Sequence, residues 1–320
     1  MSAATTATAS FRDRAVAMAP TYGAAVALVV LVLANVAFTP NFAAMSNLWT
    51  ILLEVSTTVL VAIGMTLVIG TGGIDLSVGS VMAVASVVAT TSIGRGAGAA
   101  VLTALAASAA VGVLNGVLVT KAKIQPFVVT LATLIAGRGI AQVVSHDGEL
   151  IPFENASFEY LGKGYVGPAP FQVVAMVLAV AAAWFLMRST SFARYVMAVG
   201  GNERAARLAG VRVDAARLTV YVASAVLAGF AGVIVTARLG TTDPANVGNG
   251  IELDAIAAVV VGGTPLSGGR VTVLGTLVGA LIMEVITTSF NMHLVPYPWS
   301  LVVKATIILF AVFVQRPKVA

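Results

Sequence analysis

Four carboxylates lie in or beside long apolar stretches, where a charged group is costly. They are Glu54, Asp75, Asp254 and Glu284. A carboxylate in that setting can exchange a proton or coordinate a sodium ion, which is the chemistry of an ion-coupled transporter. Each also has a structural interpretation, because Asp75 can cap a helix and Glu54 and Glu284 lie near enough to a membrane face to be paired or hydrated. Ion-coupled transport therefore stays open as one hypothesis.

Residues 199–211, VGGNERAARLAGV, form a short charged segment between apolar stretches. Asn202 can cap a helix there, glycines bracket it, and Glu203, Arg204 and Arg207 lie within two turns of one another. This pattern indicates binding of a soluble partner rather than acid–base catalysis. The alternative is an ordinary basic loop helix, which is common on the cytoplasmic side of membrane proteins.

No catalytic pattern accompanies these groups. The sequence has no cysteine and two histidines, His146 and His293, far apart and without the spacing of a zinc site. It also lacks a GxxxxGK[ST] phosphate loop, so ATP hydrolysis would belong to another chain. We therefore expect no enzyme activity, no metal and no cofactor bound by this chain.

The elements that must hold these residues are transmembrane helices. Hydrophobic residues make up 59% of the 320 residues, charged residues make up 10%, and the mean hydropathy is +0.99. These values indicate an all-α polytopic membrane protein. Runs that can cross the bilayer predict about ten spans: 22–38, 50–69, 78–93, 97–119, 127–145, 171–187, 215–237, 253–261, 271–290 and 299–314. The run 253–261 is too short alone, so it must extend into flanking residues or be a broken helix lined by protein.

Positive charge predicts the orientation. If the spans alternate from an inside N-terminus, most Lys and Arg residues fall in the cytoplasm and only Arg95, Lys163 and Arg238 fall outside. Both termini and residues 199–211 are then cytoplasmic. We expect a disordered cytoplasmic tail over residues 1–20 and one permease domain over residues 21–320.

Two similar octets within the sequence suggest an internal repeat. GGIDLSVG at residues 72–79 and GGTPLSGG at residues 262–269 share glycines, a leucine and a serine at constant offset, each before an apolar run. They predict a pseudo-repeat whose helix N-termini lie near a midplane pathway. The alternative is two ordinary glycine-rich turns.

Four segments carry a family resemblance. IGTGGIDLSVGSVMAVAS at 69–86, AVGGNERAARLAGVRV at 198–213, IELDAIAAVVVGGTPLSGG at 251–269 and GTLVGALIMEVITTSFNM at 275–292 resemble the permease subunits of ribose-type carbohydrate ABC importers. The resemblance implies a bacterial inner-membrane subunit that pairs with a second permease subunit. It also implies cytoplasmic ATPase subunits that bind ATP and Mg, and an extracytoplasmic binding protein that delivers sugar.

The resemblance implies a coupling helix at about residues 201–210 that contacts the ATPase. Its expected coupling residues are Gly201, Asn202, Glu203, Arg204, Arg207, Leu208 and Gly210. Small and weakly polar groups are expected to line a pathway for a neutral monosaccharide or polyol. The pathway candidates are Asp75, Ser77, Asn115 and Thr130. The related branched-chain amino-acid permeases have a similar architecture and remain an alternative, as does ion-coupled transport.

Depth along the predicted helices suggests ion pairs. Counting about 1.5 Å per helical residue puts Glu54 and Arg138 at similar depth, and likewise Glu284 and Lys304. Because a lone charge in hydrocarbon usually finds a partner, we predict these two pairs. The alternative is that each side chain reaches the membrane interface on its own.

Overall fold

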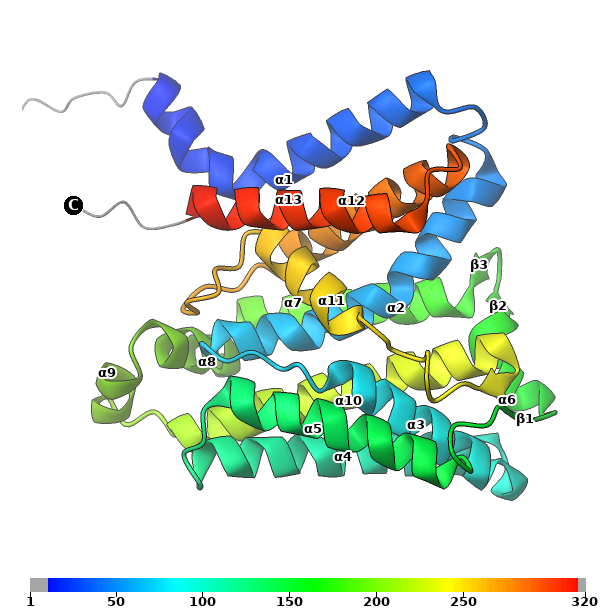
Figure 1. Ribbon diagram of the computed structural model, residues 1–320. Helices are drawn as coiled ribbons and strands as arrows, with labels where there is room; N and C mark the ends of the chain where they lie inside the picture. Colours follow the sequence, from blue (N-terminus) through cyan, green and yellow to red (C-terminus); the bar gives the residue numbers. More distant parts are fainter. Residues whose placement is uncertain (1–10, 316–320) are drawn as a thin grey trace, which may run out of the picture.

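The computed structural model describes residues 11–315, and for residues 11–22, 297, 314 and 315 it describes the backbone only. The chain is almost entirely helical (Figure 1). The elements in chain order are α1 (Phe11–Phe38), α2 (Met45–Gly70), α3 (Val78–Ser92), the 3-10 turn η1 (Ile93–Arg95), α4 (Ala97–Thr120), α5 (Pro126–Val144), β1 (Ile151–Pro152), α6 (Ala156–Lys163), β2 (Tyr165–Val166), β3 (Ala169–Pro170), α7 (Phe171–Ser189), α8 (Ser191–Gly201), α9 (Glu203–Leu208), α10 (Val213–Leu239), β4 (Thr241–Thr242), α11 (Ile251–Val261), α12 (Val273–Met292) and α13 (Tyr297–Gln315).

A helix occupies each of the ten predicted spans, which confirms the all-α polytopic fold. Among the described residues, seven helices are long and apolar enough to cross a membrane: α2, α3 with η1, α4, α5, α7, α10 and α12. Shorter apolar helices cover residues 23–38 and 298–313. The remaining predicted span is α11, which has 11 residues and whose second half, Ala257, Ala258, Val259 and Val260, is buried by protein.

Helices α2 and α10 form the centre of the bundle. Helix α2 packs against α7, α10, α11 and α12, and its side chains from Val55 to Gly70 are almost all buried. Helix α10 packs most extensively against α4. Gly112 of α4 faces the α10 backbone so closely that an added Cβ would lie 2.8 Å from the carbonyl oxygen of Tyr221. Small residues thus permit the close helix contact that stabilises bundles in lipid.

An interrupted segment, residues 71–77, joins α2 to α3. It begins beside α8, where the Gly269 amide donates to the Gly70 carbonyl at 3.1 Å. It ends at Ser77, which is buried against Asn115 of α4. Helix α3 therefore begins inside the bundle and runs toward the end opposite α9 (Figure 1).

A second interrupted segment, residues 240–250, joins α10 to α11 from the other end of the bundle. Arg138 of α5 donates to the carbonyls of Pro244 and Val247 at 2.9 and 2.7 Å. Gly248 has φ +70°, and an added Cβ would lie 2.6 Å from the carbonyl oxygen of Gly79. The beginnings of α3 and α11 therefore meet backbone to backbone inside the bundle.

These two segments mark the two halves of an internal pseudo-repeat, and the two halves run in opposite directions through the bundle. Helix α3 packs on α4, α5 and α10, while α11 packs on α12, α13 and α2. The repeat thus matches α2–α5 with α10–α13, and α11 runs toward the α9 end while α3 runs away from it. Inverted repeats with discontinuous helices are a common transporter architecture.

The glycine-rich octets are not equivalent in this repeat. The first precedes α3, whereas the second precedes α12. The predicted repeat is present, but the octets are wrong as its marker. They instead contact each other at the α9 end, where an added Cβ on Gly268 would lie 2.7 Å from the Gly72 amide nitrogen.

The predicted pair of Glu54 with Arg138 is wrong, and Glu284 and Lys304 form no direct ion pair, although the charge of Lys304 does act on Glu284. Arg238 at the end of α10 binds Glu54 through two hydrogen bonds of 2.9 and 3.3 Å. Lys304 binds Asp254 of α11 at 3.1 Å, and Glu284 accepts a hydrogen bond from Thr288. Depth fixes only the position along a helix. The partner depends on which side chains face each other: α2 packs on α10, and α13 packs on both α11 and α12, with the Lys304 ammonium placed against Asp254 of α11.

The predicted disordered tail is wrong in part. Residues 1–10 lie outside the described residues. Residues 11–20 form the first part of α1. They are continuous with the apolar run and contain several good helix formers, so the helix extends through them.

We expect that Lys304→Met lowers the free energy of unfolding by about 1–3 kcal/mol, because it removes the cation that the Asp254 carboxylate binds. Lys304 is 7% exposed, so water replaces this contact poorly. Adding Asp254→Asn should restore part of the loss. Thermal unfolding in detergent measures both effects, with Glu284→Gln in the Lys304→Met background for comparison. A larger rescue by the Glu284 change than by Asp254→Asn would contradict the observed pairing.

Candidate functional site: the α9 hairpin and the buried polar cluster

Helix α9 is a short, capped helix that projects from one end of the bundle (Figure 1). The Asn202 side chain accepts a hydrogen bond from the Ala205 amide at 3.0 Å, so the predicted cap is present. Gly210 follows with φ +82°, a conformation that favours glycine and turns the chain toward α10. Ala206 is buried, whereas Arg204 is exposed and Leu208 is 90% exposed. Leu208 is therefore accessible from outside the bundle.

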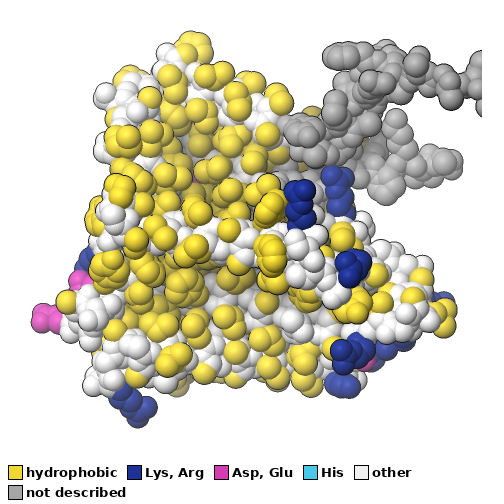
Figure 2. Space-filling model, turned by 180° about the vertical axis from the view of Figure 1, so that it is seen from behind, with side chains coloured by type: hydrophobic (Ala, Val, Ile, Leu, Met, Phe, Trp, Pro, Cys, Tyr) yellow, Lys and Arg dark blue, Asp and Glu magenta, His cyan; other side chains and the backbone are white. Residues whose placement is uncertain are grey.

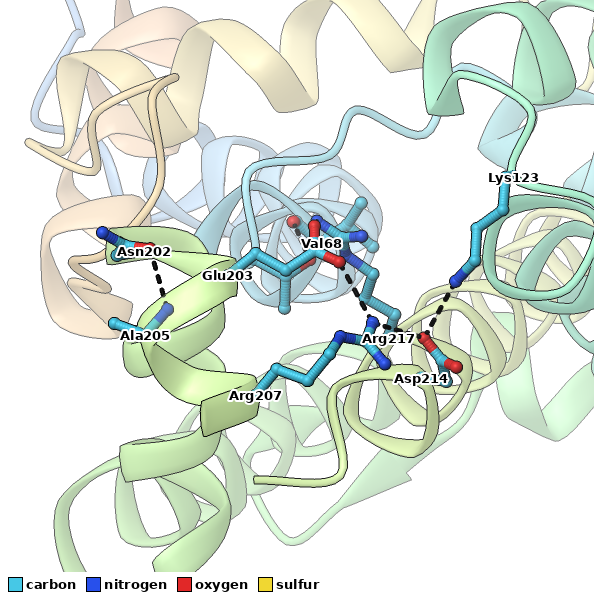
Figure 3. Close-up of polar contacts among 9 residues, drawn as sticks. Val68, Lys123, Asn202, Glu203, Ala205, Arg207, Asp214 and Arg217 are labelled. Carbon is cyan, nitrogen blue, oxygen red and sulfur yellow. Dashed lines mark hydrogen bonds and ion pairs between the residues drawn. The ribbon is translucent and has the colours of Figure 1, made fainter. Parts of the chain in front are cut away.

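An ion network ties α9 to its neighbours (Figure 3). Glu203 pairs with Arg207 at 3.2 Å and with Arg217 of α10 at 2.9 Å. Asp214 pairs with Arg207 at 3.1 Å and with Lys123, which precedes α5, at 3.3 Å. The network therefore links α9 to the start of α10, which follows it in sequence, and to the segment before α5, which is distant in sequence.

The network stabilises the charged form of its exposed members. Partial burial by itself would raise the pKa of Glu203. Hydrogen bonds and the charges of Arg207 and Arg217 outweigh that burial, so the pKa of Glu203 is below its ordinary value. A lowered carboxyl pKa contributes stability that is present above the ordinary pKa and lost as the pH falls through the lowered one. The network is therefore intact at neutral pH.

The end of α8, helix α9 and the turn into α10 together form the α9 hairpin. Backbone contacts join this hairpin to the first interrupted segment, residues 71–77. An added Cβ on Gly200, near the end of α8, would lie 2.0 Å from the carbonyl oxygen of Gly70. The same carbonyl accepts the hydrogen bond of Gly269. Gly201, by contrast, is exposed, and an added Cβ there meets nothing closer than 4.0 Å. Displacement of the hairpin would therefore press directly on the start of residues 71–77.

Three of the four pathway candidates, Asp75, Ser77 and Asn115, form one hydrogen-bond cluster inside the bundle, and Thr130 bonds the backbone next to Asp75. Ser77 donates from both its amide and its hydroxyl to Asp75 Oδ1, at 3.0 and 2.6 Å. Asn115 Nδ2 donates to the Ser77 hydroxyl at 2.9 Å. Thr130 of α5 donates to the carbonyl of Ile74 at 3.2 Å. All four residues are buried, so a transport role for them remains a prediction and requires a rearrangement that admits the substrate.

The cluster includes residues that the sequence did not single out. Ser224 of α10 donates to Asp75 Oδ2 at 3.0 Å, and Thr133 donates to the Asn115 side-chain oxygen at 2.6 Å. The hydroxyl of Tyr221 is buried without a hydrogen-bond partner, one turn from Ser224. At the hairpin, Lys123, Asp214 and Arg217 were also missed as partners. Asp214 and Arg217 lie one turn apart at the start of α10, a spacing that could have indicated them; Ser224 gave no such signal.

The four carboxylates that could support ion coupling all have protein partners. Asp75 accepts hydrogen bonds from two serines, and Glu284 accepts one from a threonine. Glu54 and Asp254 are bound by cations. Among the described residues no group of three or more His, Cys, Asp or Glu is arranged to hold a metal ion.

Comparison with known proteins identifies similar chains. A family described as "Branched-chain amino acid transport system / permease component" matches residues 47–312. The chain is 41% identical over 298 residues to the ribose import permease protein RbsC of Escherichia coli K12, covering 92% of each chain. It is 42% identical over 261 residues to the galactofuranose transporter permease protein YtfT of the same strain, covering 81% of this chain and 76% of that one. It is 35% identical over 283 residues to the L-arabinose ABC transporter permease protein AraH of Azospirillum brasilense, covering 87% and 82%.

The cluster makes a prediction about Asp75. In Asp75→Asn the side-chain oxygen can still accept from Ser77 and the amide can donate to the Ser224 hydroxyl, so we expect a folded protein that retains transport. In Asp75→Ala three hydrogen bonds lose their acceptor, and the free energy of unfolding should fall by about 2–4 kcal/mol. Thermal unfolding and uptake assays measure the two effects. A folded Asp75→Asn protein without transport would show that the negative charge itself is needed.

Proposed function

This chain belongs to the permease components of ABC transporters, in the group that imports sugars, and we propose that it carries a neutral monosaccharide or polyol into the cell. Residues 21–320 would act as one permease domain in the bacterial cytoplasmic membrane. The observation that carries the proposal is the similarity, over 92% of each chain, to a ribose import permease. The relatives named for galactofuranose and arabinose support the same substrate class.

The buried cluster suits a neutral, hydroxyl-rich substrate. Ser77, Asn115 and Thr130 offer groups that can exchange hydrogen bonds with sugar hydroxyls. We place the pathway beside these residues, where α3 and α11 begin. Because they are buried in this conformation, the pathway would open only when the interrupted segments move.

A branched-chain amino acid is the alternative that the description of the matching family suggests. Such a substrate carries an ammonium and a carboxylate, and desolvating both requires charged or strongly polar partners. The ionisable member of the cluster is Asp75, whose two oxygens already accept hydrogen bonds from serines. The chemistry of the cluster therefore favours a sugar.

Ion-coupled transport is the remaining alternative. It would need a carboxylate that is free to bind an ion, whereas the four candidates are engaged by cations or hydroxyl groups. We propose instead that energy comes from ATP and Mg bound to separate cytoplasmic ATPase subunits. This chain would bind neither.

The proposed coupling site is the α9 hairpin, with Gly201, Asn202, Glu203, Arg204, Arg207, Leu208 and Gly210. The ion network would make α9 move as one piece with α10. The contact of Gly200 with the Gly70 carbonyl would transfer that movement to residues 71–77. The ATPase cycle would thus reach the polar cluster through packed backbone.

The orientation follows from the proposed coupling. The described ends of α1 and α13 lie at the same end of the bundle as α9 (Figure 1). If α9 meets a cytoplasmic ATPase, both termini are cytoplasmic. The opposite end, with α6 and the two short strand pairs, would meet an extracytoplasmic binding protein. A second permease subunit, identical or different, would complete the transporter.

Uptake measurements test the substrate class. A strain lacking this chain should lose uptake of at least one labelled pentose, hexose or polyol and keep uptake of leucine and isoleucine. The loss should be restored by the wild-type chain, and the restored uptake should survive a proton ionophore but fail after ATP depletion. Loss of leucine uptake alone would favour the amino-acid alternative, and sensitivity to the ionophore with ATP maintained would favour ion coupling.

Leu208 allows a test of the coupling site that leaves the ion network in place. We expect Leu208→Gln to weaken association with the ATPase subunit about tenfold or more, as loss of a central apolar anchor does. Co-purification and binding to the isolated ATPase measure this effect. Leu294→Gln is the matched control, since Leu294 is also 90% exposed but follows α12 at the opposite end. Equal ATPase binding by both variants would place the ATPase contact elsewhere.

A further inference from the structure

An apolar groove lies between α7 and α12, on the outside of the bundle. Its volume is about 270 Å³, and it is lined by Met176, Val177, Val180, Ala181, Trp184, Leu274 and Leu277. All seven residues are hydrophobic, so the groove offers almost nothing to a sugar, which needs hydrogen bonds. An alkyl chain matches this surface.

The groove belongs to a broad apolar face at membrane depth. Exposed hydrophobic side chains surround it, including Leu178 and Phe185 of α7. Figure 2 shows such a face, with Lys and Arg side chains gathered toward the end where α9 lies. This distribution is typical of a surface in contact with lipid tails on one side and headgroups on the other.

A cationic group stands at the α9 end of the groove. The guanidinium of Arg188 lies 5.1 Å from the ring centroid of Trp184, one turn earlier on α7. Among the described residues, Arg188 pairs with no carboxylate. Arg270 precedes the groove residue Leu274 by four positions, so it lies at the same end on the α12 side.

We infer that this groove binds an anionic glycerophospholipid, with an acyl chain between α7 and α12 and the phosphate at Arg188. The stacked Trp184 holds the guanidinium at headgroup level while its ring forms the apolar wall below. Basic groups at the cytoplasmic ends of helix pairs recognise anionic headgroups in this way. The inference requires the membrane-spanning fold and the α9-inside orientation, but not the sugar substrate.

The position of the site gives it a mechanical consequence. Only Thr190 separates α7 from α8, and α8 leads directly into α9. A lipid bound at Arg188 therefore contacts the junction between α7 and α8, from which the α9 hairpin extends. The bound headgroup would restrict movement of that hairpin.

Trp184 provides a direct reporter for the groove. The sequence has three tryptophans, so Trp49→Phe with Trp299→Phe leaves Trp184 as the only one. This variant is reconstituted with its partner subunits in phosphatidylcholine bilayers. Phosphatidylglycerol or phosphatidylcholine with brominated acyl chains is then titrated in. After subtraction of a matched Trp184→Phe sample, which gives the fluorescence of the partner subunits, quenching of Trp184 gives the relative affinity of the groove for each lipid.

We expect brominated phosphatidylglycerol to quench at about fivefold lower mole fraction than brominated phosphatidylcholine, the factor expected for one cationic side chain at headgroup level. Arg188→Gln should abolish this preference, and Arg188→Lys should retain most of it. Arg95→Gln, an exposed arginine at the opposite end, should leave it unchanged. Ala181→Phe, which fills the groove, should reduce quenching by both lipids.

Two results would overturn the inference. Equal quenching by the two lipids would show an ordinary lipid boundary without headgroup recognition. Absence of quenching by either lipid in the assembled transporter, with quenching restored in the isolated subunit, would show that a second protein subunit covers the groove.

Discussion

Backbone polar groups at membrane depth set the main constraint on this structure. Residues 71–77 and 240–250 interrupt two helices inside the bundle, where unsatisfied amides and carbonyls would cost several kcal/mol each. Protein groups satisfy them. Helix α5 serves both segments, since Thr130 donates to the Ile74 carbonyl and Arg138 donates to the carbonyls of Pro244 and Val247. The position of α5 and the beginnings of α3 and α11 therefore depend on one another.

The proposed coupling route runs from α9 to the polar cluster at Asp75, and the contacts at its two ends differ in kind. At α9 the contacts are ion pairs between partly exposed side chains, which water screens and which a docking partner can rearrange at little cost. Near Asp75 the contacts are buried hydrogen bonds, which are costly to break singly. Glycine contacts at Gly200, Gly70 and Gly269 join the two regions without flexible side chains between them. In the proposed coupling, a movement that begins at exposed ion pairs would thus reach buried hydrogen bonds through close backbone contacts.

The opposite directions of the two halves also explain why the glycine-rich octets do not mark equivalent positions in the inverted repeat. The two halves share the order of long helix, interrupted segment and short helix, but they run in opposite directions through the membrane. Their side chains therefore meet different neighbours: Asp75 in the first segment is held by serines, whereas carbonyls in the second are held by Arg138. Similar octets appeared instead where two glycine-rich turns touch, because close backbone contact requires glycine on both sides.

The sequence by itself determined the features that depend on neighbouring residues. Apolar runs determined where the ten helical regions lie, and Asn202 and Gly210 determined where α9 begins and turns. The cytoplasmic orientation that the asymmetry of Lys and Arg indicates stays a prediction. The residue types of the polar cluster were also identifiable, because Asp75, Ser77, Asn115 and Thr130 stand out in apolar surroundings. Only the tertiary structure decided the partners of each charge. Glu54 binds Arg238 rather than Arg138, and Lys304 binds Asp254 rather than Glu284. Sequence spacing gives the depth of a side chain along its helix, but the partner depends on the facing helix, which long-range packing alone selects.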